Sequence, residues 1–485
     1  MEEMTKQSYK DLHKPRSEFA TRSEYLDYEL TIMKPKRWSL NLPFIDFRFE
    51  WEDLIPAIAG TIGLVVMCSA LITAFANEYG LDKSFIIENV RVDILVVSIF
   101  FVIFYSGTFN PRANLAGIHG PMMPLIPLMA SSGSHPLALG ALIAIFGIIL
   151  SVTKGGSRLI SITSHGVAGG LLIYLGAVGT IGQVSALKNW STGIEMGYLG
   201  FTVLFFNLIL YAYLARIQKR WLAIPVCSLL AVIIALILGA PFEFTTKPGL
   251  PNMNPMYWWS ENTGWKLGMP GISHFIASLP FAILAVAMWP PDFLGHRIFQ
   301  EMNFPRKAKN VIMNVDDTMT GCSLRQVVSA IFGSGCITSS WGTYMIPAAI
   351  AKRPIPGGAI LTGVLSIIVL IIGYPMDIAV WRPVLSIALL VGVYLPLLEA
   401  GIAMVKDTKD CQTAGICIFS SALVNPVFGW ALTMFLDNNS MIGDRERSKQ
   451  FNLVDRLIIP GLGFLISTLA MGIVGMIPGF PAWIQ

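Results

Sequence analysis

Long apolar segments recur along almost the whole chain, and they limit it to a membrane fold. A helix that crosses a bilayer needs about 20 mainly apolar residues. With 54% hydrophobic and 13% charged residues, the chain is predicted to be an all-α polytopic membrane protein. Including two shorter pieces at 118–130 and 342–351, we predict fourteen transmembrane segments. The twelve longer ones lie near 54–76, 92–108, 136–152, 166–186, 196–214, 222–239, 273–296, 318–334, 356–373, 384–403, 412–435 and 456–478.

The two short segments occupy the third and tenth positions, so each is third in its half if the chain is seven plus seven. Both follow sequence rich in Gly, Ser, Asn or Pro, at 110–121 and 334–342. His119-Gly-Pro-Met-Met123 also aligns with Trp341-Gly-Thr-Tyr-Met345. An odd number of segments in each half requires the halves to be inverted, and paired broken segments at matching places indicate a transporter binding site. We therefore predict 7+7 inverted repeats with broken segments 3 and 10.

Lys and Arg give the predicted orientation, because basic residues gather in cytoplasmic loops. We expect a cytoplasmic segment at 1–50, a first repeat at 51–240, an extracytoplasmic connection at 241–270 and a second repeat at 271–480. Both termini are then cytoplasmic, in the plasma membrane or in the inner membrane of a Gram-negative bacterium. This rule explains the net charge of +4 better than nucleic-acid binding does. The loop between segments 13 and 14 departs from it, with Arg445, Arg447 and Lys449 predicted outside.

The broken segments predict a pocket for a small solute. A half-helix that starts within the membrane aims free N–H groups and the positive end of its dipole at the cavity, which favours anions. Small-residue helix packing is the alternative explanation for the same residues. Trp341 could stack on a flat solute or close the cavity. The expected lining is Ile118, His119, Gly120 and Pro121 on one side, and Thr338, Ser339, Ser340, Trp341 and Gly342 on the other.

Asp292 and His296 form the second candidate group. Residues four apart share one helix face, and ionisable residues within a membrane segment suggest function by default. We predict Asp292 as the carboxylate that couples transport to a proton or sodium ion, and His296 as its relay or hydrogen-bond partner. The alternative is that Pro290-Pro291 ends the helix and leaves Asp292 as an N-cap. His296 would then lie at the membrane edge, beside Arg297.

The remaining reactive residues predict neither a metal nor an enzyme. Six cysteines show no CxxC spacing and mostly lie in apolar runs, which is typical of packing residues. No His, Asp and Glu cluster has the spacing of metal ligands, and no nucleophile and base are paired. We therefore expect no cofactor beyond a co-transported ion.

Four motifs in one order resemble the uracil transporter and its nucleobase/ascorbate relatives. These are Leu279-Pro280, Asp292-Phe-Leu-Gly-His296, Asn314–Gly321 and Ile331–Ser340, while Ser164–Gly176 is similar to that family's fifth-helix opening. The resemblance covers about residues 51–480. It implies a core domain (segments 1–4 and 8–11) that holds the substrate, a gate domain (segments 5–7 and 12–14), elevator-type movement and a homodimer.

Carried over by position, Asp292 replaces the family's substrate-binding glutamate and His296 its proton-linked histidine. The second glutamate is absent, since Trp341, Gly342 and Thr343 stand in its place. Sulfate-permease-like anion carriers share the fold and lack that second carboxylate, although they usually end in a regulatory domain that we do not find here. We expect an ion-coupled secondary transporter for a small anion, on a branch between the two families. The alternatives are a nucleobase symporter, which would bind a planar solute, and a passive anion channel.

Overall fold

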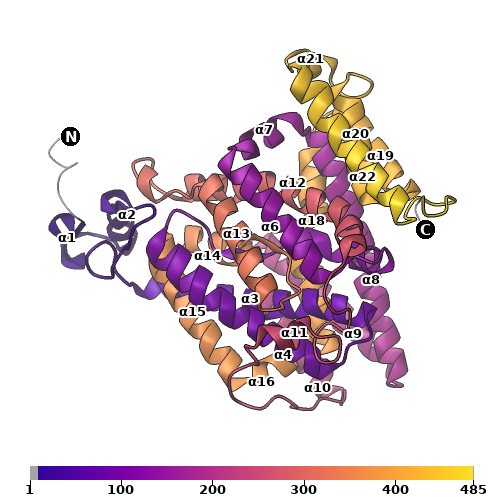
Figure 1. The fold of residues 1–485 in the computed structure, drawn as a ribbon. Helices are drawn as coiled ribbons and strands as arrows, with labels where there is room; N and C mark the ends of the chain where they lie inside the picture. Colours follow the sequence, from indigo (N-terminus) through magenta and orange to yellow (C-terminus); the bar gives the residue numbers. More distant parts are fainter. Residues whose placement is uncertain (1–8, 484–485) are drawn as a thin grey trace.

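The computed structural model describes residues 9–483, and Figure 1 shows them as a body built almost wholly of helices. Within this range, nine helices are long and apolar enough to cross a membrane. The elements of the first half are α1 (Tyr9–Leu12), α2 (Arg22–Ile32), η3 (Trp51–Asp53), α3 (Leu54–Glu78), α4 (Lys83–Val96), η4 (Val97–Phe109), β1 (Ala116–Ile118), η5 (Gly120–Leu125), α5 (Ile126–Ser131), α6 (Pro136–Val152), α7 (Gly155–Ile162), α8 (His165–Gly193), α9 (Gly197–Arg216), η6 (Arg220–Leu222) and α10 (Ala223–Ile237).

The second half repeats the pattern of long helices around one broken segment. Here α17 (Arg382–Leu389), the π-helical η8 (Leu390–Tyr394) and α18 (Leu395–Met404) form one continuous helix, Arg382–Met404. The elements are α11 (Pro255–Trp259), α12 (Ile272–Asn303), α13 (Val315–Ile331), β2 (Thr338–Ser340), α14 (Gly342–Ile350), α15 (Ile355–Ile372), α16 (Tyr374–Val380), α17 (Arg382–Leu389), η8 (Leu390–Tyr394), α18 (Leu395–Met404), α19 (Thr408–Leu423), α20 (Pro426–Asn438), α21 (Arg445–Lys449), η9 (Val454–Ile458) and α22 (Ile459–Ile473).

The two broken segments meet as a pair of short antiparallel strands. Gly117 of β1 lies opposite Ser339 of β2. Each strand is followed by one residue of similar conformation, His119 (φ −82°, ψ 81°) and Trp341 (φ −99°, ψ 84°), and then by a helix that begins at glycine. The alignment of His119 with Trp341 is therefore confirmed in backbone conformation. A side chain at residue 117 would place its Cβ 2.9 Å from the Trp341 Cα, so the strands pack this closely because residue 117 is glycine.

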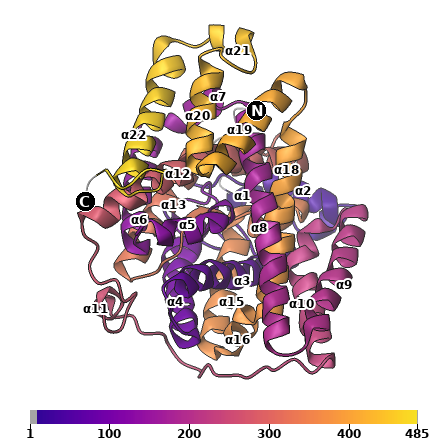
Figure 2. The same ribbon diagram turned by 90° about the vertical axis from the view of Figure 1, so that its right-hand side faces the viewer.

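The helices pack in two groups. In the first, α3 contacts α4, α14 and α15, while α6 contacts α12 and α13. In the second, α8 contacts α9, α18 and α19, and α10 contacts α17; Figure 2 shows α8, α18, α9 and α10 side by side. The predicted division into a core domain and a gate domain stays a prediction. The residue boundaries predicted for the domains stay predictions.

One predicted span is wrong, and one alternative about a helix end is excluded. The predicted span 412–435 is a hairpin of two short helices, α19 and α20, because Asn425 caps α20 through a 2.9 Å bond from the Phe428 amide and Pro426 follows at its first position. In contrast, α12 does not end at Pro290-Pro291 but continues to Asn303. Asp292 is therefore inside a helix, and its alternative role as an N-cap is excluded.

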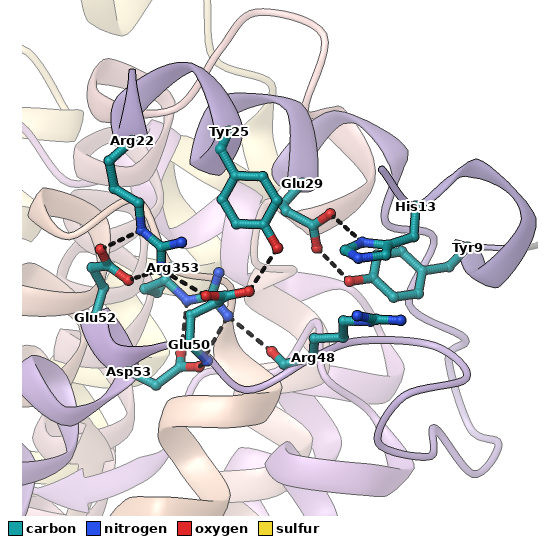
Figure 3. Close-up of polar contacts among 10 residues, drawn as sticks. All are labelled: Tyr9, His13, Arg22, Tyr25, Glu29, Arg48, Glu50, Glu52, Asp53 and Arg353. Atoms are coloured by element: carbon teal, nitrogen blue, oxygen red, sulfur yellow. Dashed lines mark hydrogen bonds and ion pairs between the residues drawn. The ribbon is translucent and has the colours of Figure 1, made fainter. Parts of the chain in front are cut away.

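The chain before α3 is folded onto the first group of helices. Figure 3 shows two neighbouring polar clusters there. The Arg353 guanidinium donates two 2.9 Å bonds to the Asp53 carboxylate, and Arg22 pairs with Glu50 and Glu52. Glu29, only 1% exposed, accepts bonds from the Tyr9 hydroxyl and the His13 ring. The predicted N-terminal segment, described from residue 9 onward, is thus held in shape by the buried Glu29 and joined to Arg353 through the carbonyl of Arg48.

Candidate functional site

A cavity of about 650 Å³, which we call the central cavity, lies between the two groups of helices. Its walls come from α3, α10, α12, α14 and the helix Arg382–Met404, and the β1 and β2 segments contribute to it. Nine of the eleven predicted site residues line it, although their roles in binding stay predictions. They are Ile118, Gly120, Pro121, Asp292, His296, Ser339, Ser340, Trp341 and Gly342.

His119 and Thr338 were expected in the lining but lie behind it. His119 is 2% exposed, and its Nε2 donates a 3.1 Å bond to the carbonyl of Ala285 in α12. Thr338 is fully buried; its amide donates to Gln326, and its carbonyl accepts a 2.8 Å bond from the Trp289 indole. Both residues therefore attach the broken segments to α12 and α13 instead of facing the solute.

Asp292 and His296 face the cavity from α12 and are tied to β2. The Ser339 hydroxyl donates a 2.9 Å bond to Asp292 Oδ2, and Ser340 Oγ lies 2.8 Å from His296 Nδ1. His296 Nε2 lies 3.9 Å from Asp292 Oδ1. The Asp292 side chain is 43% exposed, so the carboxylate can meet solute and solvent in the cavity.

Two helix N-termini point at the same space. The helical runs that begin at Gly120 and at Gly342 both start on the cavity wall. Neither receives a side-chain cap from its N-cap residue within the described chain. Uncapped N–H groups and the positive dipole ends favour an anion between them. Trp341 is 3% exposed and its indole N–H bonds to Thr343 at 2.7 Å, so little of its ring can stack on a flat solute.

The mouth of the cavity carries an ion pair that the sequence analysis counted only as loop charge. Arg220 pairs with Glu399 and donates a 3.0 Å bond to the hydroxyl of Tyr211, whose ring lies 5.7 Å from the guanidinium. Arg220 and Tyr211 line the cavity. The available signal was a basic residue directly before an apolar span, opposite an acid within another span.

A second unforeseen ion pair lies behind the broken segments. Arg325 and Asp93 are fully buried and 2.7 Å apart. Arg325 also donates to the carbonyls of Ala116 and Gly117, so it holds β1 in place. One acid and one base inside predicted apolar spans were the sequence signal, because such residues usually pair within the bundle.

Cys68 and Cys336 were expected to be separate packing residues, but their sulfurs lie 3.3 Å apart. Together with Asp93 they place three ligand atoms within 4.8 Å of one another. The Arg325 guanidinium already pairs with this carboxylate. A metal cation at this point would therefore meet a like charge at close range, which disfavours it.

The chain was compared with known proteins by sequence. It matches, over residues 1–484, the family described as "Protein of unknown function (DUF3360)". No curated protein matches it in sequence.

Solved structures show the same fold. The chain is similar to the transmembrane domain of a cyanobacterium bicarbonate transporter, BicA (12% identity, 80% of this chain and 97% of that chain, TM-score 0.50). It is also similar to SLC26A9, with 13% identity, 80% of this chain and 64% of that chain covered, and a TM-score of 0.51. A third similar structure is the murine Slc26a9 anion transporter in the inward-facing state, with 11% identity, 87% of this chain and 72% of that chain covered, and a TM-score of 0.51. The predicted fold, with two inverted repeats of seven segments in a multi-pass membrane protein, is confirmed. These structures agree with the anion-carrier side of the resemblance, and the nucleobase side stays a prediction.

Proposed function

The chain belongs to the DUF3360 family, whose description states no activity, and we propose from its central cavity that it is an ion-coupled secondary active transporter for a small anion. One observation carries the proposal: Asp292 and His296 share the cavity with two uncapped helix N-termini. The fold shared with structures titled as a bicarbonate transporter and an anion transporter supports it.

The backbone supplies most of the attraction for the anion. Gly120 and Gly342 begin the two helices at the cavity wall, and glycine lets a solute approach the N–H groups closely. Arg220 is the cation at the cavity mouth, and it is paired with Glu399. The site therefore gains its positive potential from dipoles, and such a site suits a small oxyanion or halide better than a large organic one.

The carboxylate in the same cavity supplies the coupling. Two like charges 4 Å apart repel by about 4 kcal/mol at an effective dielectric constant near 20. An ionised Asp292 therefore opposes the anion, and a proton bound there removes the opposition. Transport of the anion together with a proton follows from this arrangement.

The hydrogen bonds around His296 suit it to pass that proton. Ser340 Oγ accepts a bond from Asn114, which leaves the Ser340 hydroxyl hydrogen for Nδ1 of His296. The imidazole then carries its own hydrogen on Nε2, the nitrogen that faces Asp292 Oδ1. In this tautomer His296 can pass its Nε2 hydrogen to Asp292 while Nδ1 takes the hydroxyl hydrogen of Ser340.

Alternating access completes the mechanism. The central cavity opens beside Arg220, on the side where basic loops indicate cytoplasm. An elevator-type movement of the first group of helices against the second, within a homodimer, would carry the site to the other side of the membrane. Both termini are then cytoplasmic, as the distribution of Lys and Arg predicts.

Uptake into liposomes tests the proposal. Purified protein is reconstituted, and uptake of labelled bicarbonate, sulfate, chloride and uracil is followed with and without a pH gradient or sodium gradient. We expect saturable uptake of an anion, driven by an inward proton gradient, and counterflow against internal anion. Uptake of uracil alone would favour the nucleobase alternative, and flux without counterflow would favour a channel.

A further inference from the structure

A second cavity, of about 690 Å³, lies at the far end of the interface that holds the central cavity; we call it the distal cavity. α3 lines the central cavity with residues up to Met67 and the distal cavity from Thr73 onward. At 1.5 Å per residue, the two cavities are about 9 Å apart along this helix. Leu71 and Leu389, both buried, lie in the stretches that separate them. The two cavities are thus the two ends of one interrupted path.

The wall of the distal cavity contains an arginine with no counter-ion. Arg382, half-buried at the start of the helix Arg382–Met404, makes no hydrogen bond or ion pair within residues 9–483. Guanidinium groups are rarely left partly buried without a partner, because the charge is costly to desolvate. Its position on a cavity wall indicates that a mobile anion supplies the partner.

Two further donors in the same cavity are unused. Trp381, 9% exposed, has an indole N–H that bonds to no acceptor in the described chain. The hydroxyl of Thr73, on the opposite helix group, is also buried and unpartnered there. Buried polar groups without partners are few in folded proteins and call for an explanation. Trp381 and Thr73 both line the distal cavity, so one bound acceptor would explain both.

The backbone and the nearby acids agree with an anion. α17 begins at Arg382, and Trp381, its N-cap residue, supplies no side-chain cap among the described residues. The Asp377 carboxylate is already bound by Lys83 at 2.9 Å, by the Thr245 hydroxyl and by the Thr246 amide. The other acid of the cavity, Glu243, is exposed at its rim. Lys83 therefore matches Asp377, and Arg382 is left as a half-buried cation that no carboxylate of the described chain contacts.

We propose that the distal cavity is a second anion-binding site, in which Arg382, the Trp381 indole and the Thr73 hydroxyl hold a small inorganic anion at the opposite mouth of the transport path. This second site rests on the proposed function only in that both take a small anion as the ligand. Because Thr73 belongs to one helix group and Arg382 to the other, an anion bound between them would also hold the two groups together on this side.

Protection of an introduced cysteine tests the site without any transport. Asn189 is exposed and lines the distal cavity, and Cys411 is the exposed native cysteine among the described residues. In full-length Asn189→Cys, Cys411→Ser protein, labelling by neutral N-ethylmaleimide is timed in sodium bromide or bicarbonate and compared with gluconate at equal ionic strength. Occupancy slows labelling by up to about tenfold when the anion is at ten times its Kd.

Arg382→Gln in the same background should raise the concentration for half-protection by about tenfold or more, since hydrogen bonds to charged groups are the stronger ones. Trp381→Phe keeps the packing on Phe242, whose ring centroid lies 4.8 Å away. Because it removes only the indole N–H, it should raise the anion concentration for half-protection about two- to tenfold. Lys188 is exposed next to Asn189 in α8 but does not line the distal cavity. Lys188→Gln should therefore leave the anion concentration for half-protection unchanged.

Absence of protection, or equal protection in Arg382→Gln with an unchanged melting temperature, would overturn the site. The liposome experiment can fail while protection persists, and protection can fail while an anion is transported. The two proposals are therefore tested separately.

Discussion

A Cβ atom on Gly342 would lie 2.8 Å from Nε2 of His296. The first residue of α14 thus approaches the imidazole more closely than any side chain would allow. This contact places the positive end of α14 beside the nitrogen that faces Asp292. The start of α14, His296 and Asp292 therefore form one compact unit, as the proposed coupling requires.

Gly342→Ala should push His296 away from Ser340 and weaken anion binding. We expect a higher KM for the anion and a shifted pH dependence of uptake, with the melting temperature within a few degrees of the original. Gly295→Ala on α12 is the control, because a Cβ there meets nothing within 4 Å. Equal kinetics in both variants would show that the contact has no role in the site.

Asp292→Asn should separate exchange from coupling. The amide mimics a neutral carboxyl group, so anion exchange should persist, while uptake driven by a proton gradient should fall to background. Glu301→Gln, on the same helix in an exposed pair with Arg297, should transport normally, because such surface pairs contribute little. Gradient-driven uptake that survives in Asp292→Asn would assign the coupling to another group.

Arg325→Met should destabilise the protein strongly. It leaves Asp93 buried without its partner, which costs about 3–5 kcal/mol in comparable cases. The double variant with Asp93→Asn should recover part of the melting temperature. Because Arg325 also holds the carbonyls of β1, anion binding should stay impaired after that recovery. The exposed Arg297→Met variant is the control, and its melting temperature should hardly change.

Glu29→Gln should loosen the chain before α3, since Glu29 is the common acceptor of Tyr9 and His13. Hydrogen–deuterium exchange of residues 9–32 should rise, while the exposed Glu18→Gln variant should behave as the original protein. Unchanged exchange in Glu29→Gln would mean that packing alone holds this segment.

Alkaline pH should loosen the same segment. Burial, and next the Glu29 carboxylate, raise the pKa of the Tyr9 phenol well above its usual 10.0. The docked state therefore binds this proton more tightly than the free segment does. Its contribution to docking is complete below pH 10 and is lost as the pH rises beyond that value. Exchange of residues 9–32 measured at pH 8 and pH 10.5 checks the direction. Tyr9→Phe should reduce the dependence without removing it, because burial, and next the hydrogen bond to Glu50, also raise the pKa of Tyr25.

Hydropathy and the paired Gly-rich stretches could predict most of the long helices and the place of the cavity, because both depend on local composition. The partners of Arg325 could not be predicted, since Asp93 and the β1 carbonyls lie more than 200 residues earlier in the chain. Proline was a helix breaker at one of two places, and the predicted spans passed through both. Pro426 follows the break between α19 and α20, whereas Pro290-Pro291 lie within a helix that neighbouring elements hold together.

Because β1 pairs with β2, the two strands can meet only late in the synthesis of the chain. Gly117 meets Ser339, and 222 residues separate them. At about 5–20 residues per second, the ribosome needs roughly 10–45 s to deliver the second strand after the first. During that interval the polar backbone of residues 116–118 has neither its partner strand nor the Arg325 side chain, and lipid offers no substitute hydrogen bonds. The nascent first half therefore needs water or a chaperone around these residues, and the central cavity is complete only when the second half inserts.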